Sequence, residues 1–155
     1  MYNHDEITVS RIFRAVKIYE SSFTVEFCHC DSAGIVYYPH FYTWFDQSTE
    51  RMFKSMGFSY TVLREHFNLL GFPLLETGAS YKKACNLGDE LRMQTQVTEC
   101  TEKTFLVNHT LYHSDDSIAL EGFERRIVAV FDTSTEKGLR SAQIPDEIKL
   151  HLTAL

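Results

Sequence analysis

The chain has 155 residues, of which 44% are hydrophobic and 14% aromatic, so it can bury the core of one domain and is too short for two. Its 21 acidic and 15 basic residues give a net charge of -6, which argues against broad binding to nucleic acid or anionic membrane, because both need a basic surface. No apolar run approaches the roughly 20 residues that span a bilayer, and the first residues lack a signal-peptide layout, so we expect a cytoplasmic protein without membrane contact.

The first elements are an extension and a strand. Residues 1–21 have no clear pattern and are expected to form an N-terminal extension of uncertain structure within a single domain of residues 1–155. From Phe23 the sequence alternates, with Phe23, Val25 and Phe27 on one face, as in a half-buried strand.

The clearest helix runs from about Pro39 to Met56. Apolar residues recur in it at steps of three and four, among them Phe41 and Phe45. Proline suits the first turn of a helix, and Gly57 suits its exit. The aromatic stripe indicates a helix that lies in the core.

The rest of the chain predicts mainly strands. We expect a short helix within 60–68, extended segments over 69–75 and 79–85, a hairpin with strands near 91–98 and 104–112, a strand over 118–131, and a short helix after Pro145. A sheet with one apolar face needs a cover, which the long helix can supply. The pattern therefore predicts an α+β domain in which an antiparallel sheet of about five strands wraps around one long central helix.

The four cysteines are expected to be reduced thiols, because nothing else in the sequence indicates an oxidising compartment. Cys28-His29-Cys30 has the residue types of a metal site. A strand would place its cysteines on one face and its histidine on the other, however, and structural zinc sites usually have wider spacing and a second ligand pair. We therefore predict no metal.

Residues 31–39 read Asp-Ser-Ala-Gly-Ile-Val-Tyr-Tyr-Pro. With Val25-Glu26-Phe27 before it and the aromatic helix containing Trp44-Phe45 after it, this segment resembles the signature of the 4-hydroxybenzoyl-CoA thioesterase family, which has the hot-dog fold. The resemblance implies an acyl-CoA thioesterase that needs no cofactor beyond the coenzyme A of its substrate. It also implies a homodimer joined edge to edge, with active sites at the subunit interface, and further assembly into a homotetramer.

The resemblance assigns Asp31 as the catalytic carboxylate. When ionised, Asp31 can attack the thioester carbonyl to form a mixed anhydride, or it can activate a water as a general base, and the sequence leaves both routes open. Taken alone, an aspartate in a loop more often makes an Asx turn. Gly34 fits a tight loop or a close approach of the backbone to a ligand.

The start of the predicted helix supplies backbone donors. Because Pro39 has no N–H, the groups left there are those of Tyr38, His40 and Phe41. The aligned peptide dipoles make this end of the helix positive. The resemblance assigns the Tyr38 amide as the donor that polarises the thioester carbonyl.

The acyl pocket is expected to be aromatic. Tyr37 and Phe72 can line it for a flat ring. Tyr38 stands where Tol-Pal-associated short-chain thioesterases carry histidine, which favours an aroyl group. Ser32 and Phe72 replace a proline and a threonine of the 4-hydroxybenzoyl enzyme, so a benzoyl group stays open beside a 4-hydroxybenzoyl group. The alternatives are a short-chain acyl-CoA or acyl-carrier-protein thioesterase and a non-catalytic acyl-CoA-binding module.

Coenzyme A carries phosphates and therefore needs cations. Lys103 and Arg140 stand where the resemblance places contacts to coenzyme A. Thr101 and Glu102 replace two arginines of the 4-hydroxybenzoyl enzyme, so phosphate binding is expected to be weaker or to use other residues. Each cation can instead be a solubilising surface charge, and the further candidates are Lys82, Lys83 and Arg126.

Two more carboxylates lie in the predicted helix, Asp46 and Glu50. Another branch of hot-dog thioesterases carries its catalytic carboxylate in this helix, but we expect both residues to be solvated or structural. The histidines show no serine or cysteine nucleophile at a recognisable spacing, so the sequence does not support a nucleophile–histidine pair.

Overall fold

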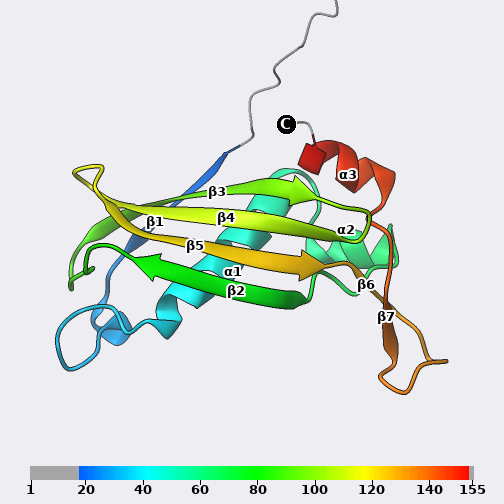
Figure 1. Ribbon diagram of the computed structural model, residues 1–155, viewed down its shortest axis with the longest axis horizontal. Helices are drawn as coiled ribbons and strands as arrows, with labels where there is room; N and C mark the ends of the chain where they lie inside the picture. The colour runs from blue at the N-terminus through cyan, green and yellow to red at the C-terminus, as the bar shows by residue number, and fades with distance from the viewer. Residues whose placement is uncertain (1–17, 154–155) are drawn as a thin grey trace, which may run out of the picture.

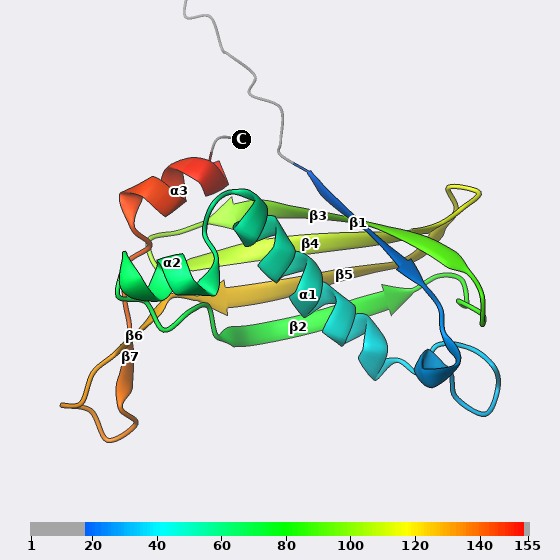
Figure 2. The same ribbon diagram turned by 180° about the vertical axis from the view of Figure 1, so that it is seen from behind.

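The computed structural model describes residues 18–153, so the predictions for residues 1–17 lie outside the described residues. Five strands form one antiparallel sheet in the order β1-β3-β4-β5-β2. They are β1 (Tyr19–Thr24), β2 (Leu74–Tyr81), β3 (Glu90–Cys100), β4 (Thr104–His113) and β5 (Ile118–Ile127). Helix α1 (Pro39–Ser55) crosses one face of the sheet, as Figures 1 and 2 show. This arrangement confirms the predicted α+β fold.

Helix α1 ends one residue before the predicted Met56. It buries one aromatic and polar stripe against the sheet, made of Phe41, Trp44, Phe45, Ser48, Thr49, Met52 and Phe53. On the sheet, alternate side chains of strand β4 are buried, and those of Phe105, Val107 and Leu111 are fully buried. Among residues 18–153, no helix is both long and apolar enough to cross a bilayer.

Strand β1 begins and ends earlier than the alternation predicts. Tyr19–Ser21, assigned to the N-terminal extension, form its first half. The strand stops at Thr24, and Val25 instead exchanges backbone hydrogen bonds with Asp89 and Gly88. Phe27 opens the 3₁₀ turn η1 (Phe27–His29) and is 83% exposed, so its predicted place on the buried face is wrong.

Strand β2 is one strand where two extended segments were expected. It continues through Gly78 because residues 77, 78 and 79 all pair with β5. The Phe123 ring of β5 lies where a side chain at position 78 would be, 2.8 Å from an added Cβ. Gly78 thus permits a close approach between neighbouring strands and does not break the strand. The short helix α2 (Tyr60–Glu65) precedes it.

The predicted strand over 118–131 is interrupted. Strand β5 ends at Ile127, and the Val128 N–H donates to the Lys103 carbonyl oxygen at 2.9 Å. The chain then leaves the main sheet as a hairpin of β6 (Ala129–Phe131) and β7 (Leu139–Ser141), which projects from one end of the molecule in Figure 1. The last element is α3 (Asp146–Thr153), the predicted helix after Pro145.

Candidate active site

A short loop between η1 and α1 holds Asp31. The Asp31 N–H donates to the Ile35 carbonyl oxygen at 2.9 Å, and the Gly34 N–H donates to the Asp31 carbonyl oxygen at 3.0 Å. Gly34 has a φ of +75°, which favours glycine. The loop is anchored to the segment before β3, because the Val36 N–H donates to the Cys85 carbonyl oxygen at 2.9 Å. The backbone therefore fixes where Asp31 stands.

The Asp31 side chain makes the Asx turn that was the competing explanation. Its Oδ1 accepts a hydrogen bond from the Ala33 N–H at 2.8 Å. Within residues 18–153, its Oδ2 has no hydrogen-bond partner, and the residue is exposed. The turn thus orients the carboxylate while one oxygen stays available for chemistry.

The Tyr38 amide is the free donor at the start of α1. The His40 N–H donates to the Tyr37 carbonyl oxygen at 3.0 Å, and the Phe41 N–H donates to that of Tyr38 at 3.1 Å. Of the three donors predicted at the helix start, two are therefore used. The Tyr38 N–H has no acceptor in the described part of the chain, and it lies at the positive end of a helix of 17 residues.

Asp31 and Tyr38 line the same cleft, which has a volume of about 480 Å³. Four of its eleven lining residues are aromatic, with ring centroids 5.3 Å apart for Tyr37 and Tyr38 and 5.7 Å apart for Phe41 and Tyr81. Tyr37 and Tyr38 are about half exposed, at 50% and 56%. A flat apolar group can therefore contact ring faces and edges here.

Two other titratable side chains in the cleft are held in their neutral forms. Loss of hydration on burial is the largest cause that raises the pKa of Tyr81 to about 12, and a hydrogen bond with the Tyr42 phenol is the second. Burial raises the pKa of the Cys85 thiol to about 11. Neither group is a base or an anionic nucleophile at neutral pH. Among the residues that line the cleft, Asp31 is the one carboxylate.

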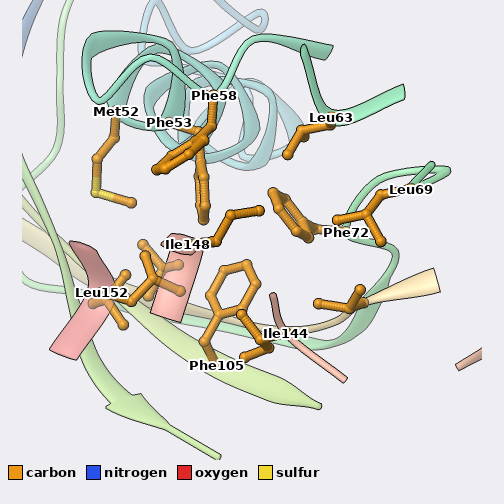
Figure 3. Packing of buried hydrophobic residues seen from close by; sticks show 13 residues of the cluster. Met52, Phe53, Phe58, Leu63, Leu69, Phe72, Phe105, Ile144, Ile148 and Leu152 are labelled. Atoms are coloured by element: carbon orange, nitrogen blue, oxygen red, sulfur yellow. The ribbon is translucent and has the colours of Figure 1, made fainter. Parts of the chain in front are cut away.

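The structure does not bring Phe72 to this cleft within one chain. Phe72 is 8% exposed and lies in the core, with its ring centroid 4.6 Å from that of Phe53 and 5.2 Å from that of Phe105. Figure 3 shows its side chain pointing into this cluster. It also lines a small second cavity of about 10 Å³, beside Tyr60 and Arg126.

Lys103 and Arg140 also lie away from Asp31 in the same chain. Lys103 is in the turn between β3 and β4, and Arg140 is on β7, where its Nε contacts Asp132 Oδ2 at 2.9 Å. The Asp31 loop is at the opposite end of the sheet in Figure 2. Strand β3 separates the two ends by roughly 30 Å at about 3.3 Å per residue.

A buried polar cluster lies between α1 and the sheet. Arg126 donates to both oxygens of Glu124, at 2.7 and 3.1 Å, and to Asp46 Oδ1 at 2.6 Å. Glu124 also accepts from the Thr49 hydroxyl at 2.6 Å, and His109 Nε2 lies 3.4 Å from it. Although burial raises the pKa of Glu124, hydrogen bonds from His109 and Arg126 outweigh it and lower the pKa to about 2. Asp46 therefore forms an ion pair with Arg126 and has a structural role.

Glu50 lines the small second cavity and lies outside the Asp31 cleft. Near Asp31, Glu26, Cys28 and His29 place one possible metal-ligand atom each within 4.8 Å of one another. His29 Nδ1 already accepts a hydrogen bond from the Glu26 N–H at 3.0 Å, and this contact caps the 3₁₀ turn.

Several cleft residues were not assigned to the pocket from the sequence, namely Ile35, Val36, Phe41, Tyr81, Ala84 and Cys85. Three of them, Tyr81, Ala84 and Cys85, lie about 50 residues from Asp31, at the end of β2 and in the segment after it. The signal that could have found them is the turn at 86–89, because it returns the chain to the sheet end where the Asp31 loop begins.

Known proteins share this architecture. A model of the thioesterase-like superfamily matches residues 25–152. The 4-hydroxybenzoyl-CoA thioesterase of Pseudomonas sp. (strain CBS-3) is 28% identical over 134 residues, which cover 81% of this chain and 92% of that protein. The solved structure of 4-hydroxybenzoyl-CoA thioesterase from that strain matches with a TM-score of 0.79 and 26% identity, covering 88% of this chain and 99% of that one.

A gentisyl-coenzyme A thioesterase structure matches with a TM-score of 0.72 and 28% identity, covering 86% of this chain and 99% of that one. The family match spans the Asp31 loop and strands β2 to β5, and it confirms the resemblance carried by residues 31–39. The chain therefore belongs to the thioesterase-like superfamily and is a thioester hydrolase with the hot-dog fold.

Proposed function

We propose that this enzyme hydrolyses an aromatic acyl-coenzyme A, of the 4-hydroxybenzoyl or benzoyl type, to the free acid and coenzyme A. The observation that carries the proposal is the shared cleft, in which Asp31 and the free Tyr38 amide stand among aromatic side chains. The 4-hydroxybenzoyl-CoA thioesterase and gentisyl-coenzyme A thioesterase relatives support an aromatic acyl group.

The proposed chemistry divides two roles between these groups. The thioester carbonyl oxygen accepts a hydrogen bond from the Tyr38 N–H, which stabilises the negative charge that develops there. The Asp31 carboxylate either adds to the carbonyl carbon and expels the thiolate, leaving an anhydride for water to cleave, or removes a proton from an attacking water. A carboxylate and an oriented amide suffice for both routes, so we propose that no metal or further cofactor takes part.

We also propose that the active unit is a homodimer joined along β2. Among the described strands, β2 pairs with β5 alone, and Leu74, Leu75 and Tyr81 are 46%, 55% and 51% exposed along it. Apolar residues on a free edge strand favour pairing with another strand. A two-fold axis would pair β2 with its copy antiparallel, which sets the Leu74 end of one subunit beside the Tyr81 end of the other.

This pairing explains the separation of the predicted site residues. Phe72 and the β6–β7 hairpin with Arg140 lie at the Leu74 end, and Asp31 lies at the Tyr81 end. In the dimer, the Phe72 region of one subunit would approach the Asp31 cleft of the other. Two such dimers would form the proposed homotetramer.

A panel of coenzyme A thioesters with a thiol-trapping dye tests the proposed substrate class. It should contain benzoyl, 4-hydroxybenzoyl and gentisyl thioesters beside acetyl, butyryl and hexanoyl thioesters, with butyryl-acyl carrier protein as a separate arm. We expect the highest kcat/KM among the aromatic thioesters. A higher kcat/KM for a short-chain or carrier-protein thioester would overturn the aromatic assignment.

A further inference from the structure

We infer that Lys82 and Lys83 bind phosphate groups of the coenzyme A part of the substrate at the mouth of the Asp31 cleft; this rests on the proposed function. Both lysines line the cleft that Asp31 and Tyr38 share. They are its only lining cations among the described residues. In the same chain, the predicted contacts Lys103 and Arg140 lie at the end of the sheet opposite to the Asp31 cleft.

The backbone explains how two consecutive side chains reach one cleft. Successive residues of a regular strand point to opposite faces of the sheet. Strand β2 ends at Tyr81, and the N–H groups of Lys82 and Lys83 both donate to the Ala119 carbonyl oxygen, at 2.8 and 3.0 Å. Because two donors converge on one acceptor, the strand alternation is lost here, and both lysines line the same cavity.

The present partners of the two ammonium groups are weak competitors for a phosphate. Lys82 Nζ lies 3.6 Å from Glu121 Oε2, and Lys83 Nζ lies 3.2 Å from Asp115 Oδ2 and donates to the neutral Ser117 hydroxyl at 2.9 Å. The charged partners are therefore Glu121 and Asp115. All four side chains are about half exposed, and such ion pairs contribute little because water and salt screen them. The 3′-phosphate of coenzyme A carries more charge than a carboxylate and presents three acceptor oxygens, so it can displace both carboxylates.

The positive charge of the two lysines also favours phosphate binding at this site, although the protein as a whole is acidic. The net charge of the chain is -6, so the phosphate groups of coenzyme A are repelled by the molecule as a whole. The charge of Lys83 reaches the cleft wall, where it opposes the rise in the pKa of the Cys85 thiol. Two adjacent cations at the mouth of the cleft can hold the phosphates while the thioester carbonyl meets the Tyr38 amide.

The test compares two thioesters of one aromatic acid, the coenzyme A thioester and the N-acetylcysteamine thioester, which has the same reacting bond and no phosphate. For the Lys82→Ala/Lys83→Ala double variant we expect KM for the coenzyme A thioester to rise about a hundredfold, since a hydrogen bond to a charged group contributes tenfold or more. We expect KM for the N-acetylcysteamine thioester to stay unchanged, and Lys82→Arg/Lys83→Arg to keep the original values.

Lys54→Ala is the matched control, because Lys54 is an exposed lysine in the last turn of α1, far from the cleft. A Lys103→Ala/Arg140→Ala variant measured beside it compares the two cation pairs. Unchanged KM values for both thioesters in the Lys82/Lys83 double variant would overturn the inference. An equal rise for both thioesters would also overturn it, because the lysines would then act on the acyl group.

Binding measured without turnover separates this inference from the proposed function. Isothermal titration calorimetry with coenzyme A and with 3′-dephospho-coenzyme A reports the phosphate contacts directly. We expect the double variant to lose affinity for coenzyme A about a hundredfold. If the wild-type enzyme turned over neither thioester, the proposed function would fail, whereas an unchanged affinity for coenzyme A would refute the lysine site alone.

Discussion

The Thr49 hydroxyl donates a hydrogen bond of 2.6 Å to Glu124 Oε2 and thereby joins the middle of helix α1 to strand β5. Glu124 is 2% exposed and also accepts from Arg126, so its carboxylate organises the polar part of the core. We expect Glu124→Gln to lower the free energy of unfolding by about 3 kcal/mol, because it leaves the buried Arg126 charge with one acidic partner fewer. Urea unfolding followed by circular dichroism measures this change.

Glu121→Gln is the control for that variant, because Glu121 is on the same strand and its side chain is 55% exposed. It should change the free energy of unfolding by less than about 0.5 kcal/mol. Equal effects of the two substitutions would show that the buried cluster does not stabilise the fold.

The same cluster predicts an acid-sensitive fold. Burial lowers the pKa of His109 from 6.5, and hydrogen bonds lower the pKa of Glu124 from 4.5 to about 2. The unfolded chain therefore binds protons that the folded chain resists, first below about pH 6.5 at the histidine and then between about 4.5 and 2 at the glutamate. Both groups make stability fall as the pH falls. Melting temperatures between pH 8 and 3 measure the decline.

A His109→Gln variant isolates the first step of that decline. It removes the group that must stay neutral, so the slope of melting temperature between pH 7 and 5 should become shallower than in the wild type. An unchanged slope would mean that His109 does not cause the loss of stability in this range.

The Gly34 backbone conformation should matter for catalysis more than for stability. A side chain at a φ of +75° is strained, although space is open around an added Cβ. We expect Gly34→Ala to reduce kcat about tenfold to a hundredfold by shifting Asp31, while it lowers the free energy of unfolding by only about 1 kcal/mol.

Gly138→Ala is the matched control for the Gly34 variant. Gly138 also has a positive φ, of +68°, with open space around it, but it lies in the β6–β7 hairpin. It should lower stability by a similar amount and leave kcat unchanged. A loss of kcat in both variants, or in neither, would argue against a special role of the Asp31 loop geometry.

How much of this could be read from the sequence depended on the range of the interactions. Helix α1 was predicted to within one residue, because its signals, the aromatic stripe and Pro39, are local. The end of β1 and the continuity of β2 were not predicted, because they depend on residues far along the chain. Val25 after β1 bonds to Asp89, and Gly78 within β2 lies against the Phe123 ring.

The site shows the same limit. The motif predicted Asp31 and the Tyr38 amide, which lie within eight residues of each other. The buried Thr49–Glu124 pair spans 75 residues, and each polar residue alone resembles a surface residue. Thr49 and Glu124 meet because α1 packs against β5, and no local sequence pattern indicates that packing.

The β2 edge predicts a dimer that is needed for activity. Leu75→Lys puts a charge on the exposed edge and should separate the two subunits joined along β2 while the fold is retained, because Leu75 is 55% exposed. Sedimentation equilibrium should show half the mass, with kcat lowered at least tenfold. The matched control is Leu150→Lys, because Leu150 is 61% exposed on α3, away from that edge. Full activity of Leu75→Lys at half the wild-type mass would contradict the shared site.

Thiol release by Asp31→Asn tests the central claim most directly. Asparagine keeps the oxygen that accepts from the Ala33 N–H, so the Asx turn and the melting temperature should be preserved. Asp132→Asn is the control, because Asp132 makes the same turn with the Ser134 N–H in the β6–β7 hairpin. With a saturating aromatic thioester, we expect kcat of Asp31→Asn to fall about a thousandfold and kcat of Asp132→Asn to stay unchanged. Full turnover by a folded Asp31→Asn enzyme would contradict the assignment of Asp31 as the catalytic carboxylate.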